Sequence, residues 1–383
     1  MRGLSGTASE GFVPPPYPYD RLDVLRTLAE RHVGGMVDLS VGTPCDPPPP
    51  EVVAALASSG SERGYPPAKG TTAYVASARA WLARRFDVHV PAGAVAACIG
   101  TKEFVATLPQ WLKLRRPLRD TVLYPAIAYP TYAMGATLAQ CRAVPVPTTS
   151  RGTMDLASLD PSDVERALVL WVNSPANPTG VLEDLDSVAA WGRDHGVVVA
   201  GDECYAEFTW NGAPRSILQT GFEGVVALHS LSKRSNLAGV RAGFYAGDPE
   251  LVGYLSEVRK HAGLMVPGPV QAAACLAWDD DVHVAAQRHT YRQRLEFMAG
   301  VLTGAGYPVG LPEGAFYLWV SHSESHPAEA GGWALADELA RRGGVLVSPG
   351  DFYGPGGHRY VRVAMVAPMP RLELVANRLA RTH

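Results

Sequence analysis

Short apolar segments alternate with longer stretches through the middle of the 383-residue chain, and this alternation constrains the fold more than any other feature. The apolar segments occupy residues 94–100, 121–125, 142–147, 167–173, 197–203, 225–230 and 242–247. Most are rich in Val, Leu and Ala on both faces, as strands buried inside a parallel sheet are. Stretches of helical length, such as 102–114, 130–140 and 184–195, lie between several of them. We therefore expect an α/β fold in which helices cover both faces of a mostly parallel, seven-stranded sheet.

The pattern changes near residue 281. A long charged helical stretch is followed by apolar segments at 315–321, 344–350 and 360–366, by a helix at 332–342 and by a terminal helix. This order predicts a smaller α+β domain. Residues 1–45 are too few to fold alone and are expected to pack on this C-terminal part or on the groove between the two parts. We therefore predict a large domain over 46–280 and a small domain formed by 1–45 together with 281–383.

Charge and composition exclude several classes of function. The formal net charge of −3 gives no basic surface for nucleic acid and no polybasic membrane patch. No apolar run approaches the roughly 18 residues that span a bilayer, and the N-terminal segment lacks the apolar core of a signal peptide, so we expect a cytoplasmic protein. The five cysteines are widely separated without a C-x-x-C pair. This spacing argues against a disulfide framework and against a metal site.

Ligands of open parallel sheets bind at the carboxyl ends of the strands. The residues that follow the apolar segments in this chain include Gly100, Thr101, Lys102, Tyr129, Asn177, Asp202, Tyr205, Ser230, Ser232, Lys233 and Arg241. Asp202 ends a very apolar segment, and a buried carboxylate must be paired or functional because an unpaired one is costly. Tyr129, taken alone, is better explained as a packed aromatic side chain. The strand ends are therefore where a ligand site is expected.

Four motifs together resemble the fold-type I pyridoxal 5'-phosphate aminotransferases of class I and II. They are NPTG at 177–180, DECY at 202–205, SLSK at 230–233, and the arginine that follows the lysine by eight residues. The resemblance extends over nearly the whole chain, from YPYD at 17–20 to the last helix. It implies fold type I, pyridoxal 5'-phosphate as cofactor, and amino-acid and 2-oxo-acid substrates.

The resemblance also implies a role for each matching residue around the cofactor ring. Lys233 matches the lysine that holds the cofactor's aldehyde as a Schiff base and later moves a substrate proton. Asp202 matches the aspartate that keeps the pyridine nitrogen protonated. Asn177 and Tyr205 match the residues that bind the ring's phenolic oxygen, and Tyr129 matches the aromatic stacked over the ring.

The resemblance also implies which residues bind the cofactor's phosphate and which bind the substrate. The residues matching the phosphate cradle are Gly100, Thr101, Lys102, Ser230, Ser232 and Arg241. Tyr65, in GYPPAKG, matches a tyrosine that reaches the phosphate of the other subunit, which implies a homodimer. Arg362 matches the arginine that binds the substrate α-carboxylate, and Gly42 matches a glycine that lines the substrate pocket together with Asn177. Lys102 either binds a distant substrate carboxylate or is a solvated residue at a helix start.

The segments SLSKRSNLAGVRAGF, RKHAGLMVPGPVQAA, IGTKE and SPGDFYGPGG resemble the actinobacterial N-succinyldiaminopimelate aminotransferases. This similarity implies that N-succinyl-LL-2,6-diaminopimelate and 2-oxoglutarate give N-succinyl-2-amino-6-oxopimelate and glutamate, a reaction of lysine biosynthesis. Two alternatives stay open: an aminotransferase of the alanine, aspartate or aromatic type, and a cofactor-dependent C–S or β-lyase. A cofactor-sensing regulator would need a basic DNA-binding domain, for which residues 1–45 are too few.

Overall fold

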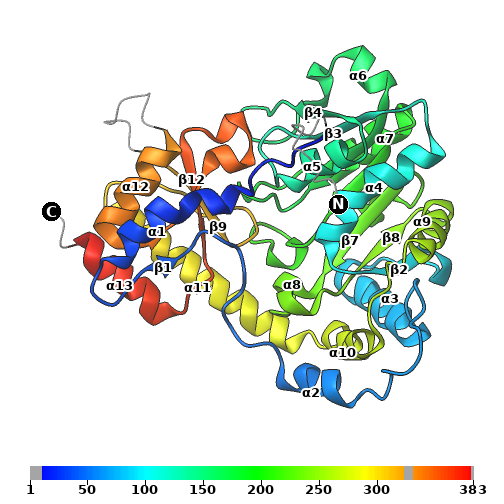
Figure 1. The fold of residues 1–383 in the computed structure, drawn as a ribbon, viewed down its shortest axis with the longest axis horizontal. Coiled ribbons are helices and arrows are strands. Elements are labelled where there is room, and N and C mark those ends of the chain that lie inside the picture. The colour runs from blue at the N-terminus through cyan, green and yellow to red at the C-terminus, as the bar shows by residue number, and fades with distance from the viewer. Residues whose placement is uncertain (1–10, 323–330, 381–383) are drawn as a thin grey trace, which may run out of the picture.

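A computed structural model describes residues 11–322 and 331–380, and a seven-stranded sheet lies at its centre (Figure 1). In spatial order the strands are β2 (Val95–Cys98), β8 (Gly243–Gly247), β7 (Val225–Ser230), β6 (Val198–Asp202), β5 (Ala167–Asn173), β3 (Thr121–Pro125) and β4 (Arg142–Val146). Strand β8 runs antiparallel to both of its neighbours, and the other neighbouring pairs are parallel. The predicted α/β fold with a mostly parallel sheet is confirmed.

Helices cover both faces of this sheet, because successive residues of a buried strand point to opposite sides. In β6, Val199 packs in a hydrophobic cluster with α3 (Thr72–Phe86), α7 (Leu185–Asp194) and α10 (Gly268–Asp279). Its neighbour Ala200 packs in a second cluster with α4 (Thr101–Arg115), α5 (Thr131–Leu138) and α9 (Pro249–His261). Helix α2 (Pro50–Ser58) packs against α10, α6 (Pro161–Glu165) precedes β5, and the four-residue α8 (Leu231–Arg234) directly follows β7.

The remaining elements form a second group, seen at the left of Figure 1. They are α1 (Asp23–Glu30), β1 (Val37–Asp38), α11 (Val282–Gly304), β9 (Tyr317–Ser321), α12 (Gly332–Gly343), β10 (Val345–Leu346), β11 (Ser348–Pro349), β12 (Tyr360–Ala364) and α13 (Met369–Ala380). Strands β11, β12 and β9 form an antiparallel sheet, and β1 pairs in parallel with β10.

One hydrophobic cluster joins this second group, and it contains Leu22 and Leu39 as well as Leu295 and Leu379. We propose on this basis that the N-terminal segment and the C-terminal part form one domain and that residues 46–280 form the other. Residues 1–10, 323–330 and 381–383 of the predicted small domain lie outside the described residues. Within the described ranges, none of the helices has the length and apolar character needed to cross a membrane.

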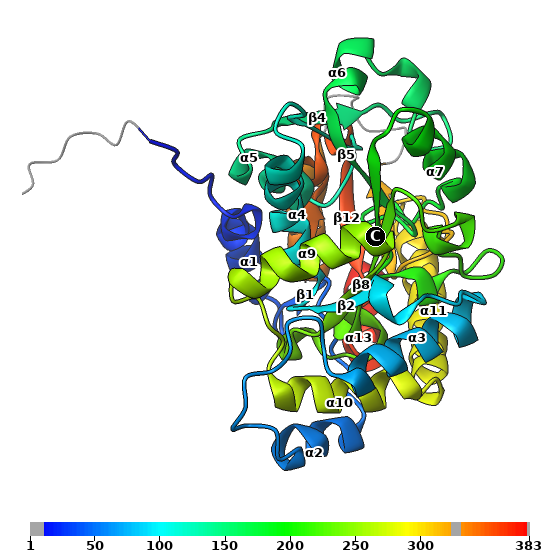
Figure 2. The same ribbon diagram turned by 90° about the vertical axis from the view of Figure 1, so that its right-hand side faces the viewer.

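The first strand is shorter than predicted, and the reason lies at Gly100. The amide of Gly100 donates to the carbonyl of Cys98 at 2.8 Å, and its φ of +68° turns the chain out of the strand. A Cβ at this position would lie 2.4 Å from Nη2 of Arg241. Glycine therefore permits both the left-handed backbone and the close approach of the Arg241 guanidinium to the start of α4. Figure 2 shows the same fold turned by 90°.

Candidate active site

A cavity of about 370 Å³ lies at the carboxyl ends of β5, β6 and β7. Its lining includes the predicted site residues Gly42, Thr101, Lys102, Tyr129, Asn177, Asp202, Tyr205, Ser230, Ser232, Lys233, Arg241 and Arg362. Parallel strands end at the same edge of the sheet, so side chains far apart in the sequence meet there. Gly100 adjoins the cavity through its contact with Arg241. The structure thus gathers these residues in one place, and their roles toward a cofactor remain predictions.

Lys233 stands in the short helix α8, directly after β7. Its Nζ donates to the carbonyl of Gly42 and lies 6.0 Å from the ring centroid of Phe316. Desolvation in the cavity, with a smaller effect from Arg362, lowers the pKa of Lys233 to about 8. An amine with this pKa is partly neutral at physiological pH, and a neutral amine is the form that attacks an aldehyde.

Asp202 ends β6 and is only 7% exposed. Its Oδ2 accepts from the Tyr132 hydroxyl at 2.9 Å, and its Oδ1 accepts from the amide of Cys204 at 3.4 Å. Burial raises the pKa of Asp202. No ion pair of Asp202 occurs within residues 11–322 and 331–380, so this buried carboxylate would gain from a cation in the cavity. A protonated pyridine nitrogen is such a cation.

The groups around Arg241 favour an anionic ligand, whereas Asp202 favours a cation. The guanidinium of Arg241 adjoins Gly100, and its Nη1 donates to the carbonyl of Ala238 at 2.9 Å. The hydroxyl-bearing residues Ser230 and Ser232 line the same cavity, and α4 begins beside it. A guanidinium, hydroxyl groups and a helix N-terminus together suit a phosphate dianion. The residues present therefore fit both ends of pyridoxal 5'-phosphate.

Arg362 lies on β12 and is only 2% exposed. Nη1 donates to Oδ1 of Asn177 at 2.9 Å, and Nη2 donates to the Tyr19 hydroxyl at 3.1 Å and to the Ser40 carbonyl at 2.5 Å. The guanidinium carbon is 4.3 Å from the ring centroid of Tyr317. Nε of Arg362 is buried without a hydrogen-bond partner in the described part of the chain. This free N–H is suited to a carboxylate ligand.

The predicted residues Tyr129, Tyr205 and Tyr65 differ in their placement. Tyr129 lines the cavity, and the hydroxyl of Tyr205 is 2.7 Å from that of Tyr317. Tyr65 is 97% exposed and is not part of the lining. The structure therefore does not bring Tyr65 to the site of its own subunit, and a role in a partner's site stays a prediction.

Several residues at the cavity were missed in the sequence. They are Tyr17, Tyr19, Val41, Thr43, Val105, Asn173, Cys204, Ala238 and Tyr317, together with Tyr132 behind Asp202. Asn173 carries a usable signal, because it is a polar residue that ends a fully apolar strand, and its Nδ2 donates to the carbonyl of Asp202 at 2.7 Å. The tyrosines carry none, because each resembles an ordinary aromatic residue of the core.

Comparison with known proteins assigns the family. The family model described as aminotransferase class I and II matches residues 34–379, and the chain belongs to this family. The chain is 42% identical over 373 residues to the 4-dedimethylamino-4-oxo-anhydrotetracycline transaminase OxyQ of Streptomyces rimosus, covering 95% of this chain and 99% of the relative. It is 32% identical over 380 residues to the LL-diaminopimelate aminotransferase of Desulforudis audaxviator, covering 95% of each.

A solved structure gives the same family. The protein titled probable N-succinyldiaminopimelate aminotransferase from Thermus thermophilus is 30% identical, with a TM-score of 0.84, and the match covers 95% of this chain and all of the other. The protein is therefore an aminotransferase of fold type I that depends on pyridoxal 5'-phosphate, as predicted. When bound, this cofactor supplies an electron-withdrawing ring that stabilises negative charge at the substrate α-carbon.

The reactivity of Lys233 should follow its lowered pKa. In cofactor-free protein, the rate of covalent attachment of added pyridoxal 5'-phosphate should rise with pH and level off above about 8, because only the neutral amine reacts. An ordinary lysine amine would show a rise continuing toward about 10.4. The measurement is the growth of visible absorbance, with Lys233→Ala as the control without attachment. Reductive trapping that labels a different lysine peptide would exclude the assignment.

Asp202 should control proton removal from the substrate α-carbon. Asp202→Asn should lower the single-turnover rate by about 100- to 1,000-fold, as loss of one electrostatic contact in an active site does. Tyr132→Phe is the matched control, because it keeps the carboxylate and removes one hydrogen bond to it, at a cost of about tenfold or less. A near-normal single-turnover rate in Asp202→Asn would show that the aspartate has another role.

Proposed function

We propose that this aminotransferase transfers the amino group of N-succinyl-LL-2,6-diaminopimelate to 2-oxoglutarate, in the cytoplasm. The observation that carries the proposal is a second cation, Lys102, in the cavity that contains Arg362. The proposed substrate has an α-carboxylate and further carboxylates at its other end, so it needs two separated cations. Names of relatives that include diaminopimelate and N-succinyldiaminopimelate support the same substrate class.

Lys102 is available for this role. It stands in the first turn of α4, and its side chain is exposed. Its Nζ is 3.4 Å from the Tyr17 hydroxyl and 4.8 Å from the centroid of that ring. Its ammonium group makes no ion pair with any carboxylate in the part of the chain that the structure describes. A cation at a helix N-terminus is disfavoured by the helix dipole, and an anionic ligand would offset this cost.

A polycyclic aromatic ketone is the second candidate substrate. The 42% identity with a relative named for an anhydrotetracycline transaminase favours it. The cavity lining also contains Tyr17, Tyr19 and Tyr129, whose rings could stack on a flat substrate. This substrate would not require the charge of Lys102, and the two candidates are therefore separable by experiment.

A half-reaction screen tests the function directly. Bleaching of the bound cofactor's visible absorbance is followed with N-succinyl-LL-2,6-diaminopimelate, LL-diaminopimelate, alanine, aspartate, an aromatic amino acid and glutamate. The proposal requires rapid bleaching by the first compound and by glutamate. Release of ammonia with pyruvate from a β-substituted amino acid would identify a lyase, and rapid bleaching only by another amino acid would reject the proposed substrate.

We propose further that the enzyme is a homodimer in which Tyr65 of one subunit completes the site of the other. The support is the exposure of Tyr65 and its place in the GYPPAKG segment between α2 and α3. A large aromatic side chain that is 97% exposed gains little in a monomer, because its apolar surface stays in water. Burial against a second copy of the chain would remove this cost.

The charge of Lys102 should matter for one substrate class only. Lys102→Met should raise KM for the succinylated substrate by about 10- to 100-fold, as expected from losing a charged hydrogen bond. The KM for alanine should remain nearly unchanged. Lys113→Met is the matched control, because Lys113 lies on the same helix and its Nζ donates to the Gln140 carbonyl at 2.7 Å instead of lining the cavity. Equal losses for both substrates would assign Lys102 to the cofactor.

Shared sites should allow complementation between inactive variants. When Lys233→Ala and Tyr65→Ala subunits are mixed after dissociation, roughly a quarter of the wild-type activity should return, because half of the dimers are hybrids with one intact site. Each variant alone, treated identically, is the control. A monomer that is fully active by light scattering and assay would contradict the shared site.

A further inference from the structure

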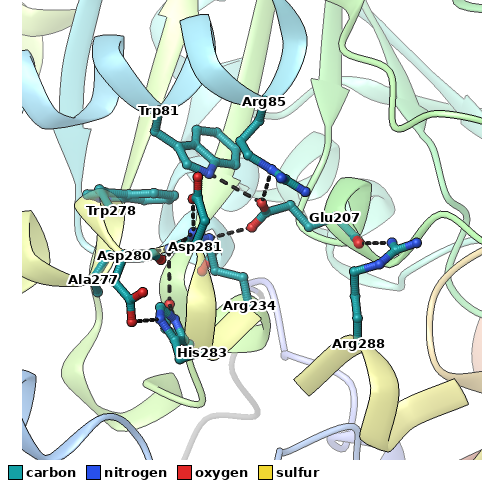
Figure 3. Close-up of polar contacts among 12 residues, drawn as sticks. Trp81, Arg85, Glu207, Arg234, Ala277, Trp278, Asp280, Asp281, His283 and Arg288 are labelled. Carbon is teal, nitrogen blue, oxygen red and sulfur yellow. Dashed lines mark hydrogen bonds and ion pairs between the residues drawn. The ribbon is translucent and has the colours of Figure 1, made fainter. Parts of the chain in front are cut away.

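A buried ionic cluster is centred on Arg234 and Glu207 (Figure 3). Arg234 follows Lys233 in the chain and is only 3% exposed. Its Nε donates to Oε2 of Glu207 at 2.5 Å, and Nη1 donates to the carbonyl of Ala277. Nη2 lies 3.3 Å from the carbonyl of Asp280. Arg234 therefore connects α8 with Glu207 and with the end of α10.

Aromatic rings enclose the same guanidinium. Its carbon lies 5.5 Å from the ring centroid of Trp81 on α3 and 5.2 Å from that of Trp278 on α10. Figure 3 shows both rings beside the ionic groups. A guanidinium held by a carboxylate, backbone carbonyls and two indole rings has few alternative positions, because its planar group is contacted along its edges and above its face.

Glu207 is the other centre of the cluster and is also 3% exposed. Its Oε1 forms an ion pair with Nε of Arg85 at 2.8 Å, while its backbone carbonyl accepts from Nη1 of Arg288 on α11. Glu207 stands two residues after Tyr205, in the turn that follows β6. The carboxylate therefore connects this turn with α3, and the backbone carbonyl connects it with α11.

Arg234 and Glu207 thus stand close in the sequence to residues that line the cavity. Lys233 precedes Arg234 by one residue, and Tyr205 precedes Glu207 by two. Neither Arg234 nor Glu207 is part of the lining of the cavity. We propose that Arg234 is a positioning residue, which through its ion pair with Glu207 fixes the Lys233 amine relative to the Tyr205 hydroxyl.

The proposed role concerns proton transfer and not substrate recognition. Lys233 must reach a proton at a defined atom, and a displacement of about 1 Å can cost about 100-fold in rate. The backbone on either side of Lys233 is therefore required to be rigid while the side chain moves. The role assigned to Arg234 is independent of which amino acid the enzyme uses, because every substrate of an aminotransferase loses the same α-proton.

Three variants test this role. Arg234→Met removes the cation, and Glu207→Gln removes the anion while keeping its shape. Arg234→Lys keeps the charge but cannot contact Glu207 and the carbonyls of Ala277 and Asp280 together, so its effects report position and not charge. Arg259→Met is the matched control, since Arg259 is 1% exposed, pairs with Glu103 at 2.6 and 2.8 Å, and lies outside the cavity lining.

The readouts are kcat, KM, thermal unfolding of cofactor-free protein, and the pH midpoint of the bound cofactor's visible absorbance. Arg234→Met should lower kcat by about 100-fold and change KM by less than about threefold. It should shift the absorbance midpoint by about one pH unit, because the attached nitrogen moves relative to the charged groups of the cavity. Arg234→Lys should give about a tenfold loss of kcat and a smaller shift. The Arg259 control should lose thermal stability without any shift of the midpoint.

A merely structural ion pair would give a different result. If the Arg234 and Glu207 variants lower the unfolding temperature as Arg259→Met does, and their absorbance midpoint and kcat remain those of the wild type, the positioning role is wrong. If Arg234→Met does not fold, Arg234→Lys and Glu207→Gln decide by the same criteria. If Arg234 and Glu207 act as one unit, removing both should have no more effect than removing one. The pH midpoint of the double variant Arg234→Met/Glu207→Gln should therefore shift no further than that of the more affected single variant. Additive shifts would contradict that unit.

Discussion

Charged groups are buried around one cavity, and the contacts that they require hold distant parts of the chain together. An ion removed from water is costly unless hydrogen bonds or opposite charge replace its hydration. Arg362 obtains these contacts from Asn177 at the sheet edge and from Tyr19 and Ser40 in the N-terminal segment, while Lys233 contacts the carbonyl of Gly42. The polar contacts that stabilise the cations therefore also tie the N-terminal segment and β12 to the large sheet.

The strands of this sheet were predictable because the apolar pattern that marks each strand lies within a few consecutive residues. Six of the strands are largely buried and mostly apolar, whereas β4 is a more exposed edge strand, and all seven lie within the predicted segments. The pairing of β1 with β10 was not predictable, because it joins two-residue segments about 300 positions apart, whose partners are set by tertiary packing. The cavity residues at strand ends followed from the same local signal, whereas Tyr132 reaches Asp202 from α5 by packing alone.

The resemblance to a known family identified the cofactor, which the chemistry of the site residues alone did not. A carboxylate, an amine and two guanidinium groups at one sheet edge indicate an anionic ligand and a reactive amine, but these groups do not identify the cofactor. The geometry adds which atoms remain available, namely the carboxylate of Asp202 without an ion pair in the described residues and Nε of Arg362 without a hydrogen bond. Both groups belong to residues that line the cavity, where a bound ligand can supply the missing partner.

The part of the cavity that we propose to bind the substrate is more exposed than the part that fits the cofactor. The residues that fit the cofactor lie on strand ends and are largely buried, whereas Lys102 is exposed and Tyr17 is 50% exposed. Tyr17 contacts Lys102 and Tyr19 contacts Arg362, so one short segment reaches both cations. Exposed residues can be exchanged at little cost to stability. We therefore expect that changes in this segment can alter substrate binding while the cofactor set stays complete.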